Sequence, residues 1–178
     1  MTAVRLGALA ALAVALYGEP KPKDVDGWDK IKWGMTMAKV RSAYDIQTQP
    51  ESNDDWTLLI LKAVKMGDIE MGAEAGARRG SEKITWVRLW SYFGLPSSAP
   101  LAGPQDFETL KNMLVQKYGA PANEEVKRGE NFRLLKTVLW TFPATSILIT
   151  LEQSASLPNL GSIYLDYTAN EKQPLGKP

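Results

Sequence analysis

The segment Trp33-Gly34-Met35-Thr36, followed by Met37-Ala38-Lys39-Val40-Arg41-Ser42-Ala43-Tyr44, decides how the rest of the chain is interpreted. Gly34 suits a tight turn, and the Thr36 hydroxyl can accept a backbone N–H two or three residues on, as a helix N-cap does. One helical face carries the residues expected to meet the core, with Ala43 near its edge: Met37, Val40, Arg41 and Tyr44. The segment therefore predicts a turn, a cap and a short amphipathic helix.

A similar unit recurs later in the chain. Its helix is expected over 105–118, capped by Gln105 or Asp106 and stopped by Gly119, with Pro121 following. Its apolar positions keep the three-to-four spacing of an amphipathic helix: Phe107, Leu110, Met113 and Leu114. A shift of 74 residues sets the two helices against each other, Tyr44 on Tyr118, and also superimposes two strand segments, 89–93 on 163–167.

Segments of β pattern follow each helix. After the first, strands are expected at 56–66, 69–78 and 83–93, and after the second at 123–126, 134–142, 146–153 and 160–168. The polar segments 47–55 and 154–159 are expected to be loops. The fold class predicted is α+β, a tandem repeat of one helix followed by antiparallel strands, with both helices packed on one face of the sheet.

Composition changes divide the chain into six parts. Residues 1–18 resemble a signal peptide, with Arg5, an apolar run over 6–16 and small residues before a cleavage point; a buried helix or a retained anchor are the alternatives. The run falls short of the ~20 residues that span a bilayer. The other parts expected are a flexible leader at 19–27, a first repeat at 28–94, a Pro-rich linker at 95–104, a second repeat at 105–168 and a disordered tail at 169–178. The predicted location is periplasmic or secreted, with no stable membrane anchor after cleavage.

Charge and missing residue types restrict the function. The chain has 21 Lys and Arg against 20 Asp and Glu, so composition gives no reason to expect nucleic acid as a partner. It has no His and no Cys, which removes the commonest general base, thiolate nucleophiles, disulfides and thiolate metal sites. No Ser in a nucleophile elbow and no Gly-rich phosphate loop is found. We therefore expect no cofactor, no metal and no catalytic residue.

Three aromatic residues at even spacing form the candidate binding surface: Trp86, Trp90 and Tyr92. Even spacing places them on one face of the strand at 83–93. If that face is buried they are core, completing the interface between sheet and helix, and this interpretation is favoured. If it is exposed, they form an aromatic platform suited to a protein partner or to a sugar.

The turn and helix at 33–44 and the helix ending Lys117-Tyr118-Gly119-Ala120-Pro121 carry a resemblance to small exported bacterial domains. The chain resembles the β-lactamase inhibitor protein and the small outer-membrane assembly lipoproteins of the SmpA/OmlA type. The resemblance implies one or two helices packed on an antiparallel sheet, and a function in binding proteins. The disulfides of the inhibitor and the lipid-bearing Cys of the lipoproteins are missing here, so disulfide-stabilised inhibition and lipid anchoring are not implied.

Three functions follow from these expectations. The favoured one is an exported, non-catalytic domain that binds a protein partner in the bacterial cell envelope. The alternative is a carbohydrate or small-ligand binding protein that uses the sheet aromatics for stacking. A minor alternative is a hydrolase with a carboxylate pair among Glu70, Glu74 and Glu82, since 70 and 74 share one face of an alternating strand.

Overall fold

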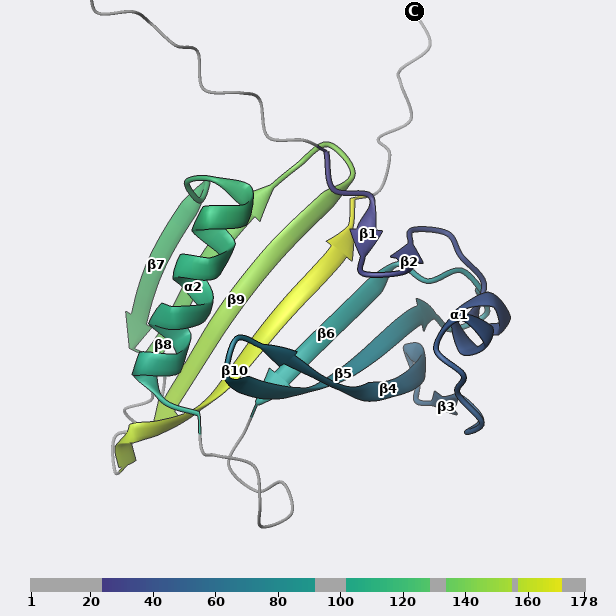
Figure 1. Ribbon diagram of the computed structural model, residues 1–178, viewed down its shortest axis with the longest axis horizontal. Helices are drawn as coiled ribbons and strands as arrows, with labels where there is room; N and C mark the ends of the chain where they lie inside the picture. The colour runs from purple at the N-terminus through teal and green to yellow at the C-terminus, as the bar shows by residue number, and fades with distance from the viewer. Residues whose placement is uncertain (1–23, 92–101, 129–133, 155–156, 171–178) are drawn as a thin grey trace, which may run out of the picture.

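A computed structural model of the chain describes residues 24–91, 102–128, 134–154 and 157–170. These residues form an α+β fold, mainly antiparallel sheet with two helices, as the sequence predicts (Figure 1). The predicted signal peptide, most of the predicted linker and most of the predicted tail lie outside the described residues. In the part of the chain that is described, no helix has the length and apolar character needed to cross a membrane.

The elements alternate between one helix and a series of strands. The helices are α1 (Met37–Ala43) and α2 (Pro104–Tyr118). The strands before α2 are β1 (Gly27–Trp28), β2 (Ile31–Lys32), β3 (Glu51–Ser52), β4 (Trp56–Met66), β5 (Ile69–Arg78) and β6 (Trp86–Ser91). The strands after it are β7 (Asn123–Arg128), β8 (Leu134–Thr141), β9 (Thr145–Ser154) and β10 (Leu157–Ala169).

One eight-stranded sheet joins the two halves of the chain. Its strand order is β3-β4-β5-β6-β10-β9-β8-β7, and β1 and β2 form a separate small hairpin. The central contact is the antiparallel pair of β6 and β10, in which Leu89 lies opposite Leu165 and Trp90 lies opposite Tyr164. Residues 74 positions apart, Trp90 and Tyr164, are thus direct neighbours in the middle of the sheet.

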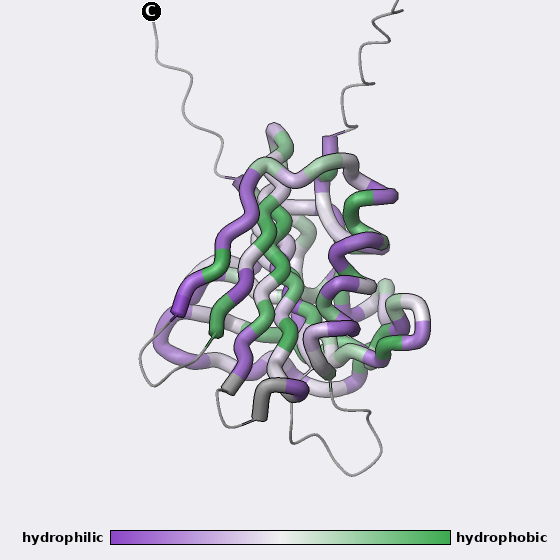
Figure 2. The backbone as a smooth tube through the Cα atoms, turned by 90° about the vertical axis from the view of Figure 1, so that its left-hand side faces the viewer, coloured by the Kyte–Doolittle hydropathy of each residue, from purple (hydrophilic) through white to green (hydrophobic). Residues whose placement is uncertain are grey.

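α2 lies over one face of the sheet, with core side chains between the two, whereas α1 lies beside the end of β5 (Figures 1 and 2). α2 packs against β9 and β10. Its buried residues are Phe107, Leu110 and Leu114, at the spacing the sequence predicts. The strands turn their fully buried apolar side chains to the same side, among them Leu59, Met71, Ala73, Ala75, Val87, Leu89, Ile147, Ile149, Ile163 and Leu165. Aliphatic burial beneath α2 is therefore what holds the sheet to it.

The helix ends confirm some predictions and correct one. The Thr36 hydroxyl accepts a hydrogen bond from the Lys39 backbone N–H at 3.4 Å, so Thr36 is the N-cap of α1. Capping of the second helix by Gln105 or Asp106 is wrong, because α2 begins at Pro104 after Gly103. Proline is tolerated in a first turn, where its missing N–H is not needed. The Asp106 carboxylate still contributes, since it accepts the Gly103 N–H at 2.8 Å.

The strands differ from the prediction mainly where they are short or at their ends. β4 and β5 have the predicted bounds, and β8 and β9 lie within one residue of them at each end. The loops predicted at 47–55 and 154–159 are partly wrong, because they contain β3 and the start of β10. A two-residue strand is too short to show a period of two, which is why β1, β2 and β3 have no sequence signal.

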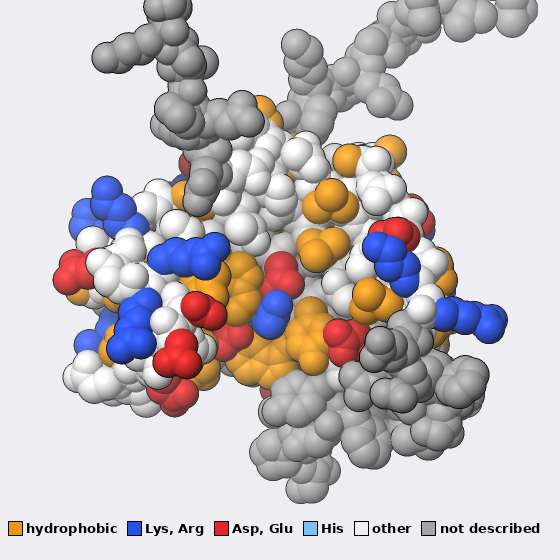
Figure 3. Space-filling view, turned by 180° about the vertical axis from the view of Figure 1, so that it is seen from behind, with side chains coloured by type: hydrophobic (Ala, Val, Ile, Leu, Met, Phe, Trp, Pro, Cys, Tyr) orange, Lys and Arg blue, Asp and Glu red, His pale blue; other side chains and the backbone are white. Residues whose placement is uncertain are grey.

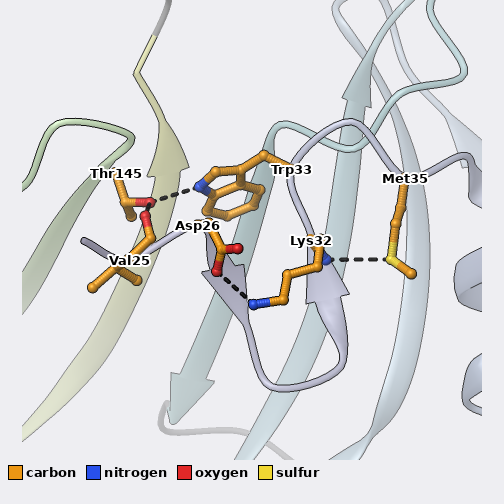
Figure 4. Close-up of polar contacts among 6 residues, drawn as sticks. All are labelled: Val25, Asp26, Lys32, Trp33, Met35 and Thr145. Carbon is orange, nitrogen blue, oxygen red and sulfur yellow. Dashed lines mark hydrogen bonds and ion pairs between the residues drawn. The ribbon is translucent and has the colours of Figure 1, made fainter. Parts of the chain in front are cut away.

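A hydrogen-bonded tie fixes the start of the described chain to the turn between β8 and β9 (Figure 4). The Trp33 indole N–H donates to the Thr145 hydroxyl at 2.6 Å, and that hydroxyl donates to the Val25 carbonyl. The Asp24 carboxylate accepts the Ala144 N–H at 3.1 Å, and Asn170 donates its backbone N–H to the Ala144 carbonyl at 3.0 Å. Both ends of the described chain therefore meet at this one turn.

Candidate functional site

The sheet face turned away from the helices holds the candidate site, and we call it the outer face. In β6, Val87 and Leu89 are buried toward the helices, whereas Trp86, Arg88 and Trp90 point the other way and are half-buried. The expectation that the aromatic face is core beneath a helix is therefore wrong, because α2 covers the opposite face and both indoles are half-buried. Tyr92, the third candidate, lies outside the described residues.

Apolar side chains gather in the middle of the outer face, with acids and bases among them (Figure 3). The residues that matter for the site come from β4, β5, β6 and β10: Trp56, Glu74, Arg78, Trp86, Arg88, Trp90, Tyr164 and Asp166. They form a compact patch because β4, β5, β6 and β10 are consecutive in the sheet.

Guanidinium groups and aromatic rings alternate across these strands. The rings of Trp56 and Trp86 have centroids 5.5 Å apart. Arg78 lies 4.7 Å from the Trp56 ring centroid, and Arg88 lies 4.8 Å from that of Trp86 and 5.2 Å from that of Tyr164. Cation–π contacts of this kind contribute about 0.5–1 kcal/mol each at exposed sites. The series therefore holds the aromatic rings in fixed positions on the surface.

Asp166 on β10 organises the charges at the centre. Its carboxylate accepts two hydrogen bonds from Arg88, at 2.7 and 3.1 Å, and a third from the Trp86 indole N–H at 3.1 Å. The Asp166 side chain is only 13% exposed, so water screens this ion pair poorly. The pKa of Arg88 is raised, because the hydrogen bond and the charge of Asp166 together outweigh the burial that lowers it. Arg88 is thus held as a cation in a defined orientation.

Two glycines of β5 allow the indoles to lie close to the sheet. Gly72 lies opposite Trp90 and Gly76 opposite Trp86 in the strand register. A Cβ atom on Gly72 would lie 2.5 Å from the Trp90 ring, and one on Gly76 would lie 2.7 Å from the Trp86 ring. Since carbon atoms do not approach so closely, any other residue would push the rings away. These two glycines thus determine how closely the indoles approach the strand, and they were not identified from the sequence.

Glu74 occupies the position between those glycines. It lies opposite Arg88 on one side and Ile60 on the other. Burial raises the pKa of its carboxyl group, and the charges of Asp166 and Glu51 add to this, while Arg88 acts in the opposite sense. Within the described residues the Glu74 carboxylate has no hydrogen bond or ion pair, because the Arg88 guanidinium is turned to Asp166. Glu74 is therefore a half-buried carboxylate that Arg88 influences only through its charge.

The three carboxylates considered for hydrolysis differ in exposure and in their position relative to β5. Glu70 and Glu74 do share one face of β5, as predicted, but Glu70 is exposed and Glu74 is half-buried. Glu82 lies beyond β5, in the connection to β6. Among the residues that the structure describes, no group of three or more acidic side chains is placed so that it could hold a metal ion.

Comparison with known proteins adds no relative: no protein-family model, no curated protein and no solved structure matches this chain. Any functional conclusion therefore depends on the geometry of the outer face.

Proposed function

We propose that this chain is an exported, non-catalytic domain that binds a protein partner through the outer face, with Trp86 and Trp90 as its central anchors. The observation that carries the proposal is the packing of both indoles over glycines on a face that no described helix covers. Rigid, half-buried aromatic side chains with an arginine among them are the residues that dominate binding energy in protein interfaces. Residues 1–18, with their resemblance to a signal peptide, support export to the periplasm or the medium.

A carbohydrate or a small ligand remains the second candidate, because aromatic rings also stack on sugars. The ring contacts favour a protein instead. The Trp56 and Trp86 rings each have a guanidinium within 5 Å of their centroid, which leaves less free ring area for a sugar. A glycan array probed with the full-length protein separates these candidates, since a specific sugar signal lost in Trp90→Ala would favour carbohydrate.

We also propose that the fold consists of two copies of one unit, α1 with β3 to β6 and α2 with β7 to β10. The strand order supports this proposal, because it runs outward from the central β6–β10 pair in the same sequence on both sides. Each half also places its helix first and its strands after it. Such a duplication would explain why Trp90 and Tyr164, related by the 74-residue shift, are opposite each other.

Site-specific photo-cross-linking in the cells that produce the protein tests the binding proposal. Ile60 on the outer face is 42% exposed and suits replacement by a photoreactive amino acid. Val126 on β7 is a matched control: it is 63% exposed and lies opposite Lys136, whose side chain reaches Glu108 of α2, so it belongs to the helix side.

We expect a discrete protein adduct from position 60, loss of that adduct in Trp86→Ala and Trp90→Ala, and none from position 126. The same adduct from both positions, or none from position 60, would overturn the proposal.

A further inference from the structure

The indoles of Trp86 and Trp90 lie on either side of Glu74 along β5. Each ring lies over a glycine, Trp90 over Gly72 and Trp86 over Gly76, and Glu74 is the residue on the same strand face between those two. Two indoles therefore flank one carboxylate along the strand. We call this arrangement the Glu74 slot.

The Glu74 carboxylate is the acidic group of the slot. Arg88 is the nearest cation across the strands, but both of its hydrogen bonds go to Asp166. Arg88 therefore acts on Glu74 only through its charge, and Glu74 has no hydrogen bond or ion pair among the described residues. Burial disfavours this charge, as the raised pKa of Glu74 indicates. A cation placed above Glu74 would relieve that penalty.

The two indole rings favour a cation that also has an apolar portion. Indole faces attract Lys and Arg side chains, which can lay their methylene chains along apolar surface and keep the charged end at a carboxylate. The exposed side chain of Ile60 and the partly buried side chain of Leu58 adjoin the slot on β4, so an apolar contact is available beside it. The chemistry fits a basic side chain that apolar residues accompany.

We propose that the Glu74 slot receives a lysine or arginine side chain of the protein partner, with its charged end at the Glu74 carboxylate and its methylene chain along the Trp90 indole, since Arg88 already lies over the Trp86 ring. This inference rests on the proposed function, since it supplies the chemistry of the partner at that site. It assigns to Glu74 a role in specificity, because a neutral side chain in the slot would leave the carboxylate uncompensated.

A titration of the full-length protein followed by NMR of the tryptophan indole N–H groups tests the proposal. The probes are acetyl-Leu-Lys-Leu-amide, its neutral counterpart acetyl-Leu-Gln-Leu-amide, and n-butylammonium. We expect saturable shifts of the Trp86 and Trp90 signals with the lysine peptide. Its affinity should exceed that of the glutamine peptide by about tenfold, the ratio that ~1.4 kcal/mol of charge-dependent interaction gives.

Two variants on β5 make the test specific. Glu74→Gln should lower the affinity for the lysine peptide to that of the glutamine peptide. Glu70→Gln should leave it unchanged, because Glu70 shares the strand face but has an exposed position one glycine further along. Equal affinities of the two peptides, or equal losses in the two variants, would overturn the proposal. Binding of n-butylammonium as tight as that of the lysine peptide would point to a free amine rather than a protein side chain.

The result also separates this inference from the proposed function. If cross-linking at position 60 recovers a partner while the peptides bind alike, the outer face binds a protein but the Glu74 slot takes no cation. If the lysine peptide binds through Glu74 and cross-linking recovers nothing, the proposal for the Glu74 slot is supported and the proposed protein-binding function is contradicted.

Discussion

The two faces of the sheet are made of different residues, although every strand supplies both. The face toward α2 is aliphatic, with side chains such as Val87, Leu89 and Ile149 fully buried. The outer face carries indoles, a phenol ring and an ion pair, all half-buried. Aliphatic side chains gain most when water is removed completely, whereas aromatic and charged groups tolerate partial exposure. One face is therefore packed into the core, whereas the other is only half-buried in the part of the chain that the structure describes.

β5 shows the same contrast within a single strand. Its alanines, Ala73, Ala75 and Ala77, point to the buried face and have no exposed surface. Its glycines, Gly72 and Gly76, point to the outer face and receive the indoles of β6. Glycine weakens a strand by roughly 0.5–1 kcal/mol relative to alanine. Because glycine lies under both tryptophans, the close packing of the indole rings must offset this loss of strand stability.

The largest effect is expected from removing an aliphatic side chain on the buried face. Leu89 has no exposed surface and lies opposite Leu165 at the centre of the sheet. Leu89→Ala should lower the free energy of unfolding by about 2–5 kcal/mol, the usual cost of a cavity in a core. Urea denaturation measures it. Ile60→Ala on the outer face is the control and should cost less than about 1 kcal/mol, since Ile60 is 42% exposed. Similar losses in the two variants would contradict the distinction between the faces.

The next effect concerns the ion pair that fixes the outer face. Asp166→Asn removes the charge that holds Arg88 and weakens the acceptor for the Trp86 indole. We expect a loss of about 1–3 kcal/mol in the free energy of unfolding, because a poorly solvated guanidinium loses its partner. Glu125→Gln, in an exposed pair with Lys127 at 2.8 Å, is the control and should cost below about 1 kcal/mol. An equal cost for both would mean that Asp166 does not organise the face.

A smaller effect tests the packing of the indole on glycine, and its sign depends on the background. In the wild type, Gly72→Ala places a methyl group 2.5 Å from the Trp90 ring and should destabilise the protein by about 1 kcal/mol. In a Trp90→Ala background the same change meets no ring and should stabilise by up to about 0.5 kcal/mol, the ordinary preference for alanine over glycine. Thermal unfolding of the four variants gives the coupling, and additive effects would contradict the contact.

The elements could be predicted from the sequence wherever periodicity was long enough. β5 alternates over ten residues, and α2 keeps its apolar spacing over fifteen. The structure therefore confirms the predicted strand and the predicted helix. Segments such as β3, with two residues, carry no period and were missed. The N-cap of α2 was misplaced because Gln105 and Asp106 have better capping side chains than Gly103, and only the tertiary structure shows which residue precedes the first turn.

The candidate site could be predicted only in part. Even spacing placed Trp86 and Trp90 on one strand face correctly, but it does not say which face a helix covers. Glu74 and Asp166 belong to the site because β6 pairs with β5 on one side and with β10 on the other. Asp166 lies beside Arg88, 78 residues away in the chain, because β10 pairs with β6. The periodicity of a single segment cannot reveal which strands pair.

The smallest effect isolates Glu74 and uses pH. Its pKa in the folded protein is raised above the ordinary value of 4.5, chiefly by burial, with Asp166 and Glu51 adding and Arg88 opposing. The folded state therefore binds this proton more tightly than the unfolded chain, and the contribution of Glu74 to stability is lost as the pH rises from about 4.5 through the raised pKa. Glu74→Gln lacks that titration. The variant should be more stable than the wild type at pH 7, by less than about 0.5 kcal/mol, and equal to it near pH 3.5, as measured by urea denaturation at both values. A variant that is less stable at pH 7 would mean that the carboxylate already has a stabilising partner within the chain, and the slot would then hold no uncompensated charge for a lysine or arginine to meet.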